Sequence, residues 1–295
     1  MSRRAALGGM VSMMIARDAL AQGAGHGAIR LSGRREQGGW FTGRVPTGTR
    51  RLGYLPDALA SGMVPVLDAP NVEAVPLAPD GRFFIGIDRD SPLQGLLIMD
   101  QGAARIQPVA IAPRAWPIEH IDVPFHPPAV PDEDFARIRA GEIARIKAAR
   151  AQVTGATGWA QSFIWPAHGR ISGRFGSQRI YRGTPGAYHS GLDIAPGAGA
   201  TYVAPADGVV VLAADAPFTL EGNLLILDHG MGLNSAFLHA ERLLVREGDR
   251  VSQGQPLGLV GMTGRATGPH LHWSLCWQAA RLDPLLILPS TDRAA

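Results

Sequence analysis

Five residues in the C-terminal part of the chain carry side chains that can bind a metal ion or transfer a proton near neutral pH. His189 and Asp193 lie four positions apart, His239 stands by itself, and His270 and His272 are separated by one residue. Most of the nine histidines of the chain fall in this region. Imidazole nitrogens and carboxylate oxygens are common zinc ligands, and a neutral imidazole is also a proton acceptor. The residue types therefore predict a metal site with acid–base groups beside it.

The spacing within each pair decides whether its side chains can meet. Alternate residues of a strand share a face at about 7 Å, so His270 and His272 would project into one cleft, as one ligand and one catalytic base require. His189 and Asp193 would be neighbours on a helix, but Gly191 and a nearby proline argue against one and favour a bulge or bend at Gly191. Two imidazoles and one carboxylate make a catalytic zinc set with a fourth position for water. The other imidazoles are then free to move protons.

Each pair alone is a weak signal, because histidines with one or three residues between them also occur by chance. Scattered structural histidines are the simplest alternative. The pairs gain weight because they follow one another within a β-rich unit of about 85 residues.

The elements that must position these residues are mostly strands. We expect residues 160–288 to form a β-rich domain, with apolar strands at 208–212 and 223–227 and a strand–turn–strand at 245–251. Residues 28–127 predict a small β domain of sandwich type. Its expected strands are 28–31, 63–67, 72–77, 82–87, 95–99 and 109–111, with a hairpin turn at Asp80-Gly81.

A linker helix is predicted at 131–151, between these two domains. Acidic residues at 132–134 favour its start, and basic residues at 145–150 favour its end. Phe135, Ile138, Ile143 and Ile146 recur near helical spacing, and the arginines are interpreted as a solvated face.

Composition excludes several other classes. The formal net charge is only +3 and there is no dense basic run, so we expect no nucleic-acid partner. No apolar run approaches the roughly 18 residues that a membrane span needs. Cys276 is the single cysteine, which excludes an internal disulfide framework and a thiolate metal cluster.

Residues 1–21 are typical of a secretory signal peptide. Arg3 and Arg4 precede a short, mostly apolar run, and Ala19-Leu20-Ala21 is an A-x-A cleavage site. The paired arginines leave twin-arginine and general secretory export equally open. We therefore expect an exported, periplasmic protein.

The segment from about Trp165 to Leu288 resembles the lysostaphin/LytM-type zinc metallopeptidases, enzymes that cleave peptide bonds in bacterial peptidoglycan. The most specific motifs are the stretch 189–195 around His189 and Asp193, the stretch 237–239 ending in His239, and the stretch 263–272 ending in His270 and His272. The N-terminal β domain and its linker helix are similar to exported Gram-negative members. The resemblance implies a mainly β fold that ends in a β-sandwich metallopeptidase domain.

The resemblance also assigns roles by position. It implies that His189, Asp193 and His272 hold one Zn²⁺ per chain and that His239 and His270 are catalytic, with no binding site for an organic cofactor. His229 matches a structural position, and His168, His120 and His126 have no assigned role. The chain departs from the family pattern at Phe237, where tyrosine is usual, and at Ala240 and Ser274; none of these removes a ligand.

The resemblance implies a zinc-dependent endopeptidase that hydrolyses peptide cross-links of peptidoglycan during cell-wall remodelling, with the peptide stems as substrate and cell-wall or division proteins as candidate partners. A LytM-like activator of a cell-wall amidase is the main alternative, although such relatives usually lack ligands that stand here. A lipoyl-like carrier is a weaker alternative, because it needs a modifiable lysine at its hairpin and the chain's only lysine is Lys147.

Overall fold

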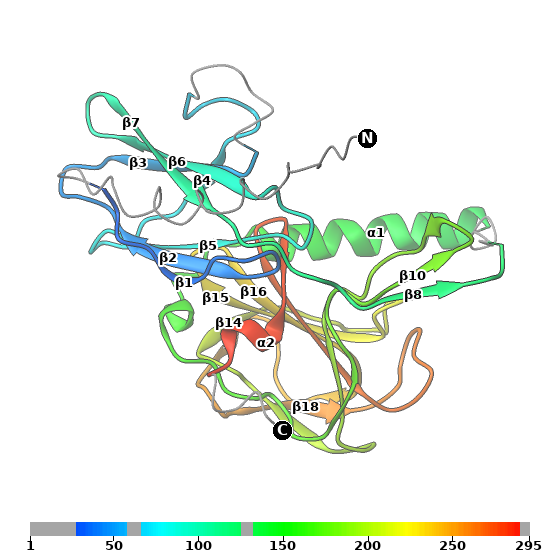
Figure 1. Ribbon diagram of the computed structural model, residues 1–295. Coiled ribbons are helices and arrows are strands. Elements are labelled where there is room, and N and C mark those ends of the chain that lie inside the picture. Colours follow the sequence, from blue (N-terminus) through cyan, green and yellow to red (C-terminus); the bar gives the residue numbers. More distant parts are fainter. Residues whose placement is uncertain (1–27, 58–65, 125–131, 290–295) are drawn as a thin grey trace, which may run out of the picture.

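The computed structural model describes residues 28–57, 66–124 and 132–289. The predicted signal peptide at 1–21 lies outside these residues, as does His126. Within the described ranges the fold is mainly β, with one long helix between an N-terminal β region and a C-terminal β-rich region (Figure 1). The predicted fold class is therefore confirmed.

The N-terminal region contains two small sheets whose side chains meet in one core. The sheets have the orders β1-β2-β5 and β4-β3-β6-β7. Phe41 of the first sheet contacts Tyr54 of the second edge to face, with ring centroids 5.8 Å apart. The strands are β1 (Ser32–Arg34), β2 (Trp40–Arg44), β3 (Arg51–Leu55), β4 (Glu73–Val75), β5 (Arg82–Gly86), β6 (Gln94–Asp100), β7 (Ala104–Ala110) and β8 (Ile118–Ile121).

Three local predictions in this region are wrong. Residues 28–31 form no strand, because the backbone of Ile29 is held by the side-chain amide of Gln107 instead of a neighbouring strand. Residues 66–67, the described part of the expected strand 63–67, lie outside any strand. Asp80-Gly81 does form a turn, but β5 after it pairs with β2 and not with β4, so the turn closes no hairpin.

The C-terminal region is built around a ten-stranded sheet. Its main path runs β17-β14-β15-β16-β19-β12-β9, and β13, β18 and β20 pair with it off this path. The elements are η1 (Gly158–Ala160), β9 (Arg170–Gly173), β10 (Gln178–Tyr181), β11 (Thr184–Pro185), β12 (Leu192–Ala195), β13 (Thr201–Val203), β14 (Gly208–Ala213), β15 (Asn223–Gly230), β16 (Leu233–Leu243), β17 (Arg250–Val251), β18 (Pro256–Val260), β19 (Leu271–Trp277), β20 (Ala280–Leu282) and α2 (Pro284–Ile287).

The strand–turn–strand expected at 245–251 is only partly present. The Asp249 carboxylate accepts a hydrogen bond from the backbone N–H of Arg246, which folds residues 246–249 into a turn. Only Arg250 and Val251 continue as the short strand β17.

Helix α1 (Glu133–Arg150) begins where its sequence predicts, because the carboxylate of Asp132 accepts a hydrogen bond from the Phe135 N–H at 2.7 Å. Two of its predicted apolar positions lie outside the buried face: Ile138 is 47% exposed and Ile143 is 38% exposed. Ala149 and Ile146 pack instead on β14, β15 and β16. Among the described residues no helix is both long and apolar enough to cross a membrane.

Polar contacts also fasten α1, and they correct the interpretation of its arginines as a solvated face for Arg139, whereas Arg137 is exposed as predicted. Arg139 donates to both carboxylate oxygens of Glu221, at 2.6 and 2.7 Å, and to Glu142 at 2.9 Å. Glu142 in turn accepts hydrogen bonds from the backbone and the hydroxyl of Thr219, each at 2.6 Å. The helix is therefore tied to the loop that leads into β15.

The two regions form a continuous structure. Strand β8 pairs in parallel with β10, so the N-terminal region adds a strand beside the segment that precedes His189. Gly86 of β5 leaves room for Trp277 and Leu282, since a Cβ at position 86 would lie 2.6 Å from Trp277. One hydrophobic core cluster includes residues of both regions.

Candidate metal centre

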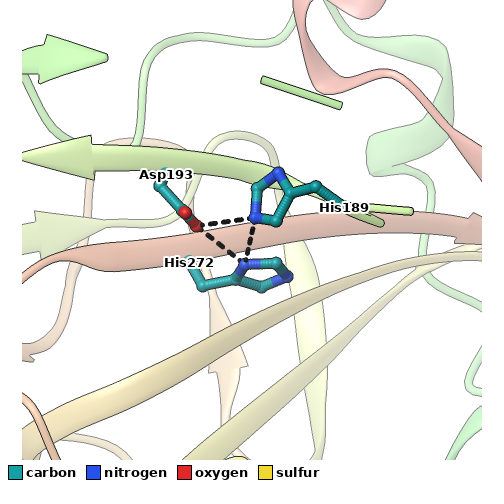
Figure 2. A group of neighbouring side chains, drawn as sticks. All are labelled: His189, Asp193 and His272. Atoms are coloured by element: carbon teal, nitrogen blue, oxygen red, sulfur yellow. Dashed lines mark hydrogen bonds and ion pairs between the residues drawn. The ribbon is translucent and has the colours of Figure 1, made fainter. Parts of the chain in front are cut away.

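Three side chains converge on one point beside β12 and β19 of the large sheet (Figure 2). Asp193 Oδ1 lies 3.1 Å from His189 Nε2 and 2.8 Å from His272 Nδ1, and the two nitrogens are 3.2 Å apart. The structure thus brings together the three predicted ligands, which are separated by up to 83 residues in the chain.

Strand pairing explains how two of these side chains meet. Asp193 on β12 lies directly opposite His272 on β19 in an antiparallel pair, the arrangement that brings Cβ atoms closest. His189 joins them from the loop before β12, where its N–H donates to Ser177 and its C=O accepts from Gly176. The backbone bends at Gly191, as expected, whereas the register shift lies between Asp193 and Ile194.

Hydrogen bonds fix the orientation of the His189 ring. Its Nδ1 lies 3.1 Å from the carbonyl oxygen of Arg174, which can only accept, so Nδ1 carries the proton and Nε2 faces the cluster. His189 Nε2, His272 Nδ1 and Asp193 Oδ1 are all lone-pair atoms in their metal-ligating forms. Their close approach therefore requires a proton or a cation among them.

Two further histidines flank the cluster, and both keep Nε2 free. His270 Nδ1 lies 2.8 Å from the carbonyl of Gly268, and its Nε2 is 3.7 Å from Asp193 Oδ1. His239 Nδ1 lies 2.8 Å from the carbonyl of Thr263. The ring centroids of His239 and His270 are 5.0 Å apart. Both predicted catalytic histidines are thus placed beside the three predicted ligands, each with its Nε2 directed away from the carbonyl that holds Nδ1 and available to a substrate or a water.

The backbone of His239 adopts an unusual conformation. Its φ is +64°, in the left-handed region that non-glycine residues seldom occupy. Phe237, two residues earlier, is fully buried and stacks on Tyr202, with ring centroids 5.4 Å apart. Regular alternation would place residue 239 on the same side as Phe237. The left-handed turn interrupts that alternation, and the N–H of His239 donates to the Glu221 carbonyl instead of a strand neighbour. Such strain is common at functional sites.

Burial and hydrogen bonding set the charges in the site. Burial opposes ionisation of Asp193, but hydrogen bonds from His189 and His272 outweigh it, so the pKa of its carboxyl lies well below the ordinary value. Burial alone would lower the pKa of His189, yet its hydrogen bond to Asp193 raises it. Burial lowers the pKa of His272 and of His239. At neutral pH Asp193 is therefore a carboxylate, and His239 is a neutral proton acceptor.

The other predicted positions lie away from this chemistry. His229 is fully buried, with its ring nitrogens 2.8 Å from the Asp207 carbonyl and 2.8 Å from the Ser235 hydroxyl, which agrees with a structural role. His120 and His168 are exposed. The carbonyls of Arg174 and Thr263, which orient His189 and His239, carry no signal in the sequence because every residue has a carbonyl group.

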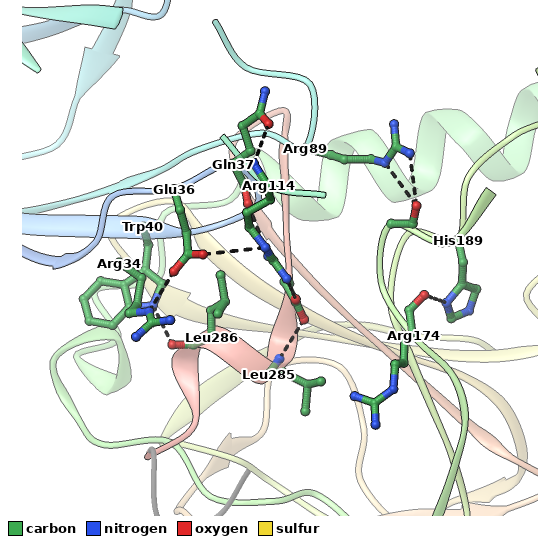
Figure 3. Close-up of polar contacts among 12 residues, drawn as sticks. Arg34, Glu36, Gln37, Trp40, Arg89, Arg114, Arg174, His189, Leu285 and Leu286 are labelled. Carbon is green, nitrogen blue, oxygen red and sulfur yellow. Dashed lines mark hydrogen bonds and ion pairs between the residues drawn. The ribbon is translucent and has the colours of Figure 1, made fainter. Parts of the chain in front are cut away.

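The N-terminal region braces the loop that carries His189 (Figure 3). Arg89 is buried and donates two hydrogen bonds, at 3.0 and 3.3 Å, to the carbonyl of Gly176. The N–H of Gly176 donates in turn to the carbonyl of His189 at 2.8 Å. Arg114 pairs with Asp283 at 2.8 Å, and the Trp40 indole donates to Leu286, so the region also holds the C-terminal segment.

A known protein family matches the part of the chain that contains this site. The family model for peptidase family M23 matches residues 187–284, which include His189, Asp193, His239, His270 and His272. This part of the chain is a peptidase M23 domain. The predicted recognition is therefore confirmed.

Curated relatives that match the M23 domain include two kinds of protein. Over 107 residues, 36% of this chain, it is 41% identical to the peptidoglycan DD-endopeptidase ShyA of Vibrio cholerae, of which that stretch is 24%. Over 125 residues, 42% of this chain, it is 34% identical to the murein hydrolase activator NlpD of Escherichia coli, of which that stretch is 31%. The chain spans less than a third of either relative.

A solved structure has a similar overall fold. A Pseudomonas aeruginosa crystal structure assigned to peptidase M23 is 23% identical and has a TM-score of 0.63, with 86% of this chain and 95% of that chain covered. The similarity extends beyond the M23 domain to most of the N-terminal region, and at this identity it concerns the fold alone.

Proposed function

We propose that the chain is a zinc-dependent endopeptidase that hydrolyses peptide cross-links of bacterial peptidoglycan. The observation that carries this proposal is the complete site: two imidazole nitrogens and a carboxylate oxygen within 4.8 Å of one another, with two more histidines beside them. Stability of the fold alone does not explain why three ligand atoms converge or why His239 has a left-handed backbone conformation.

The donor set fits zinc. His189, Asp193 and His272 supply the N, N, O set of catalytic zinc sites. The Arg174 carbonyl fixes the His189 tautomer, as backbone carbonyls commonly do for metal-binding histidines. A zinc ion held there supplies Lewis-acid polarisation of a carbonyl and lowers the pKa of water. In this proposal Asp193 is committed to the metal.

The remaining histidines perform the proton transfers. His239 is neutral at pH 7 and presents Nε2, which suits it to accept a proton from the attacking water. His270 presents Nε2 from the other side of the same space and can donate a hydrogen bond to developing negative charge or a proton to the leaving amine. The proposal leaves the division of these steps between His239 and His270 open.

The acidic groups favour peptide over glycan cleavage. Glycosidases usually place two carboxyl groups on either side of the scissile bond. Here Asp193 belongs to the metal set, and Glu221 is engaged by both guanidinium nitrogens of Arg139. Peptidoglycan as substrate is consistent with the names of the relatives, and the predicted signal peptide supports export to the periplasm.

A second candidate is activation of a separate amidase, which the similarity to NlpD favours. The two functions differ in what purified protein does alone. We expect the zinc-loaded chain, incubated with purified peptidoglycan, to convert cross-linked dimeric muropeptides to monomers with no new reducing ends and no sugar-free peptides, as read by mass spectrometry. An activator would leave the dimers intact and would release sugar-free peptides only when an amidase is added.

A further inference from the structure

A cavity of about 260 Å³ lies between helix α1 and the large sheet, directly beside the candidate metal centre. His272 and Ser190 form the wall on the site's side, and Ile143, Ile146 and Leu238 form an apolar part. The charged residues around it are Arg139, Lys147, Arg150, Glu221 and Arg281. A group bound in this cavity would therefore lie next to the predicted reacting centre.

The positive charges in the cavity outnumber the negative ones. Glu221 and the neighbouring Glu142 are both occupied by Arg139, which contacts them at 2.6 to 2.9 Å. Within the described part of the chain, the side chains of Lys147, Arg150 and Arg281 form no ion pair. Three cationic side chains thus surround one small space, and Glu221, the carboxylate among its described lining residues, is already paired with Arg139.

Arg150 is the least satisfied of the three. Its Nε atom is buried and has no hydrogen-bond partner, an arrangement that costs free energy unless a ligand completes it. Burial lowers the pKa of Arg150, and the charge of Arg281 close by lowers it further. Two like charges held together around an unpaired buried donor are typical of an anion-binding site.

We propose that this cavity, here called the anion pocket, binds a carboxylate of the peptide substrate through Arg150 and Arg281, with Lys147 adding charge. The proposal rests on the proposed function and names the part of the substrate that it recognises. A carboxylate fits because guanidinium groups bind its two oxygens in parallel. The same three cations also line a larger cavity of about 800 Å³, but that cavity includes none of the five predicted site residues.

The test compares a cross-linked peptide that has free carboxylates with the same peptide in which they are carboxamides. Binding is measured by calorimetry on the His270→Ala variant, and turnover is measured on the otherwise unaltered chain. We expect the free-carboxylate peptide to bind at least about tenfold more tightly and to have the lower KM. Arg281→Gln and Arg150→Gln should each remove most of this preference, by weakening binding and raising KM for the free-carboxylate peptide alone. Arg137→Gln, an exposed residue of α1, is the matched control and should keep it.

Equal affinity for the two peptides would overturn the anion pocket, as would a preference that survives in the Arg281→Gln chain. Arg281 provides this test even if the Arg150→Gln chain fails to fold. The binding measurement also distinguishes failure of the anion pocket from failure of the proposed endopeptidase function. Selective binding of the carboxylate without cleavage by the unaltered chain would contradict the proposed function and support the pocket. Cleavage of both peptides with equal KM would contradict the pocket alone.

Discussion

Gly191 lies against the ring of His272, so closely that a Cβ at position 191 would stand 2.6 Å from His272 Nε2. Gly173 has the same relation to the Asp193 carboxylate on the neighbouring strand. Both glycines therefore serve the site by the absence of a side chain. Gly191 leaves space for the ring of His272, and Gly173 leaves space for the carboxylate of Asp193.

Gly191→Ala should weaken zinc binding because the added methyl group displaces the His272 ring. We expect a loss of about 10- to 100-fold in affinity, the range produced by disturbing groups that orient a ligand. Competition with a chelator measures it. Gly141→Ala is the control, because position 141 is exposed on α1 with nothing within 4 Å, and it should leave zinc affinity unchanged. Equal affinity in the two variants would mean that the contact at Gly191 does not position the ligand.

His272→Ala and His270→Ala should separate metal binding from catalysis. The first removes a predicted ligand, so elemental analysis should find most of the zinc lost. The second should keep its zinc and its fold but lose about 10²- to 10⁴-fold in turnover, the usual contribution of a positioned proton-transfer group. His239→Ala should behave like His270→Ala. Full zinc occupancy in the His272→Ala chain would exclude this residue as a ligand.

His229 should make stability depend on pH. Burial lowers the pKa of His229 to about 4, against about 6.5 in an unfolded chain. Between these pH values the unfolded chain binds more protons, so the free energy of unfolding is full above about pH 6.5 and falls as the pH drops toward 4. The shift corresponds to about 3 kcal/mol. Urea titrations across this range should show a shallower pH dependence for His229→Gln, whereas exposed His168→Gln should keep the original slope.

Arg89→Ala should affect both stability and the metal site. It removes two hydrogen bonds to the Gly176 carbonyl and leaves that group buried, at a cost of about 2 kcal/mol. Because Gly176 holds the backbone of His189, we also expect weaker zinc binding. Arg105→Ala, an exposed position on β7, is the control and should change stability by less than about 0.5 kcal/mol. A stability loss with unchanged zinc affinity would show that the N-terminal region does not position His189.

The site was more predictable from sequence than the contacts that support it. His270 and His272 follow the two-residue period of a strand, so their convergence is a local property that spacing reveals. Asp193 meets His272 only because β12 and β19 pair, and here the family resemblance supplied the connection. The left-handed backbone at His239 has no sequence signal, because it depends on the hydrogen bond to the Glu221 carbonyl.

Long-range polar contacts account for most of what the sequence did not reveal. The sequence of α1 predicts a solvated face for its arginines. Arg139 instead binds Glu221, which lies 82 residues away in the chain. The apolar residues Ile138 and Ile143 suggest a buried face, yet the helix packs through Ala149 and Ile146. Pairing of β8 with β10 joins residues about 60 positions apart. None of these contacts follows from periodicity, because periodicity describes one element at a time.

The central claim is that this chain hydrolyses peptide cross-links by itself, with its own metal and its own histidines. The most direct measurement is the fate of a purified cross-linked muropeptide dimer incubated with the zinc-loaded chain and no other hydrolase. The account predicts two monomers, with formation abolished by chelation, restored by zinc and nearly absent with His270→Ala. An intact dimer, together with full zinc occupancy of the unaltered chain, would contradict it.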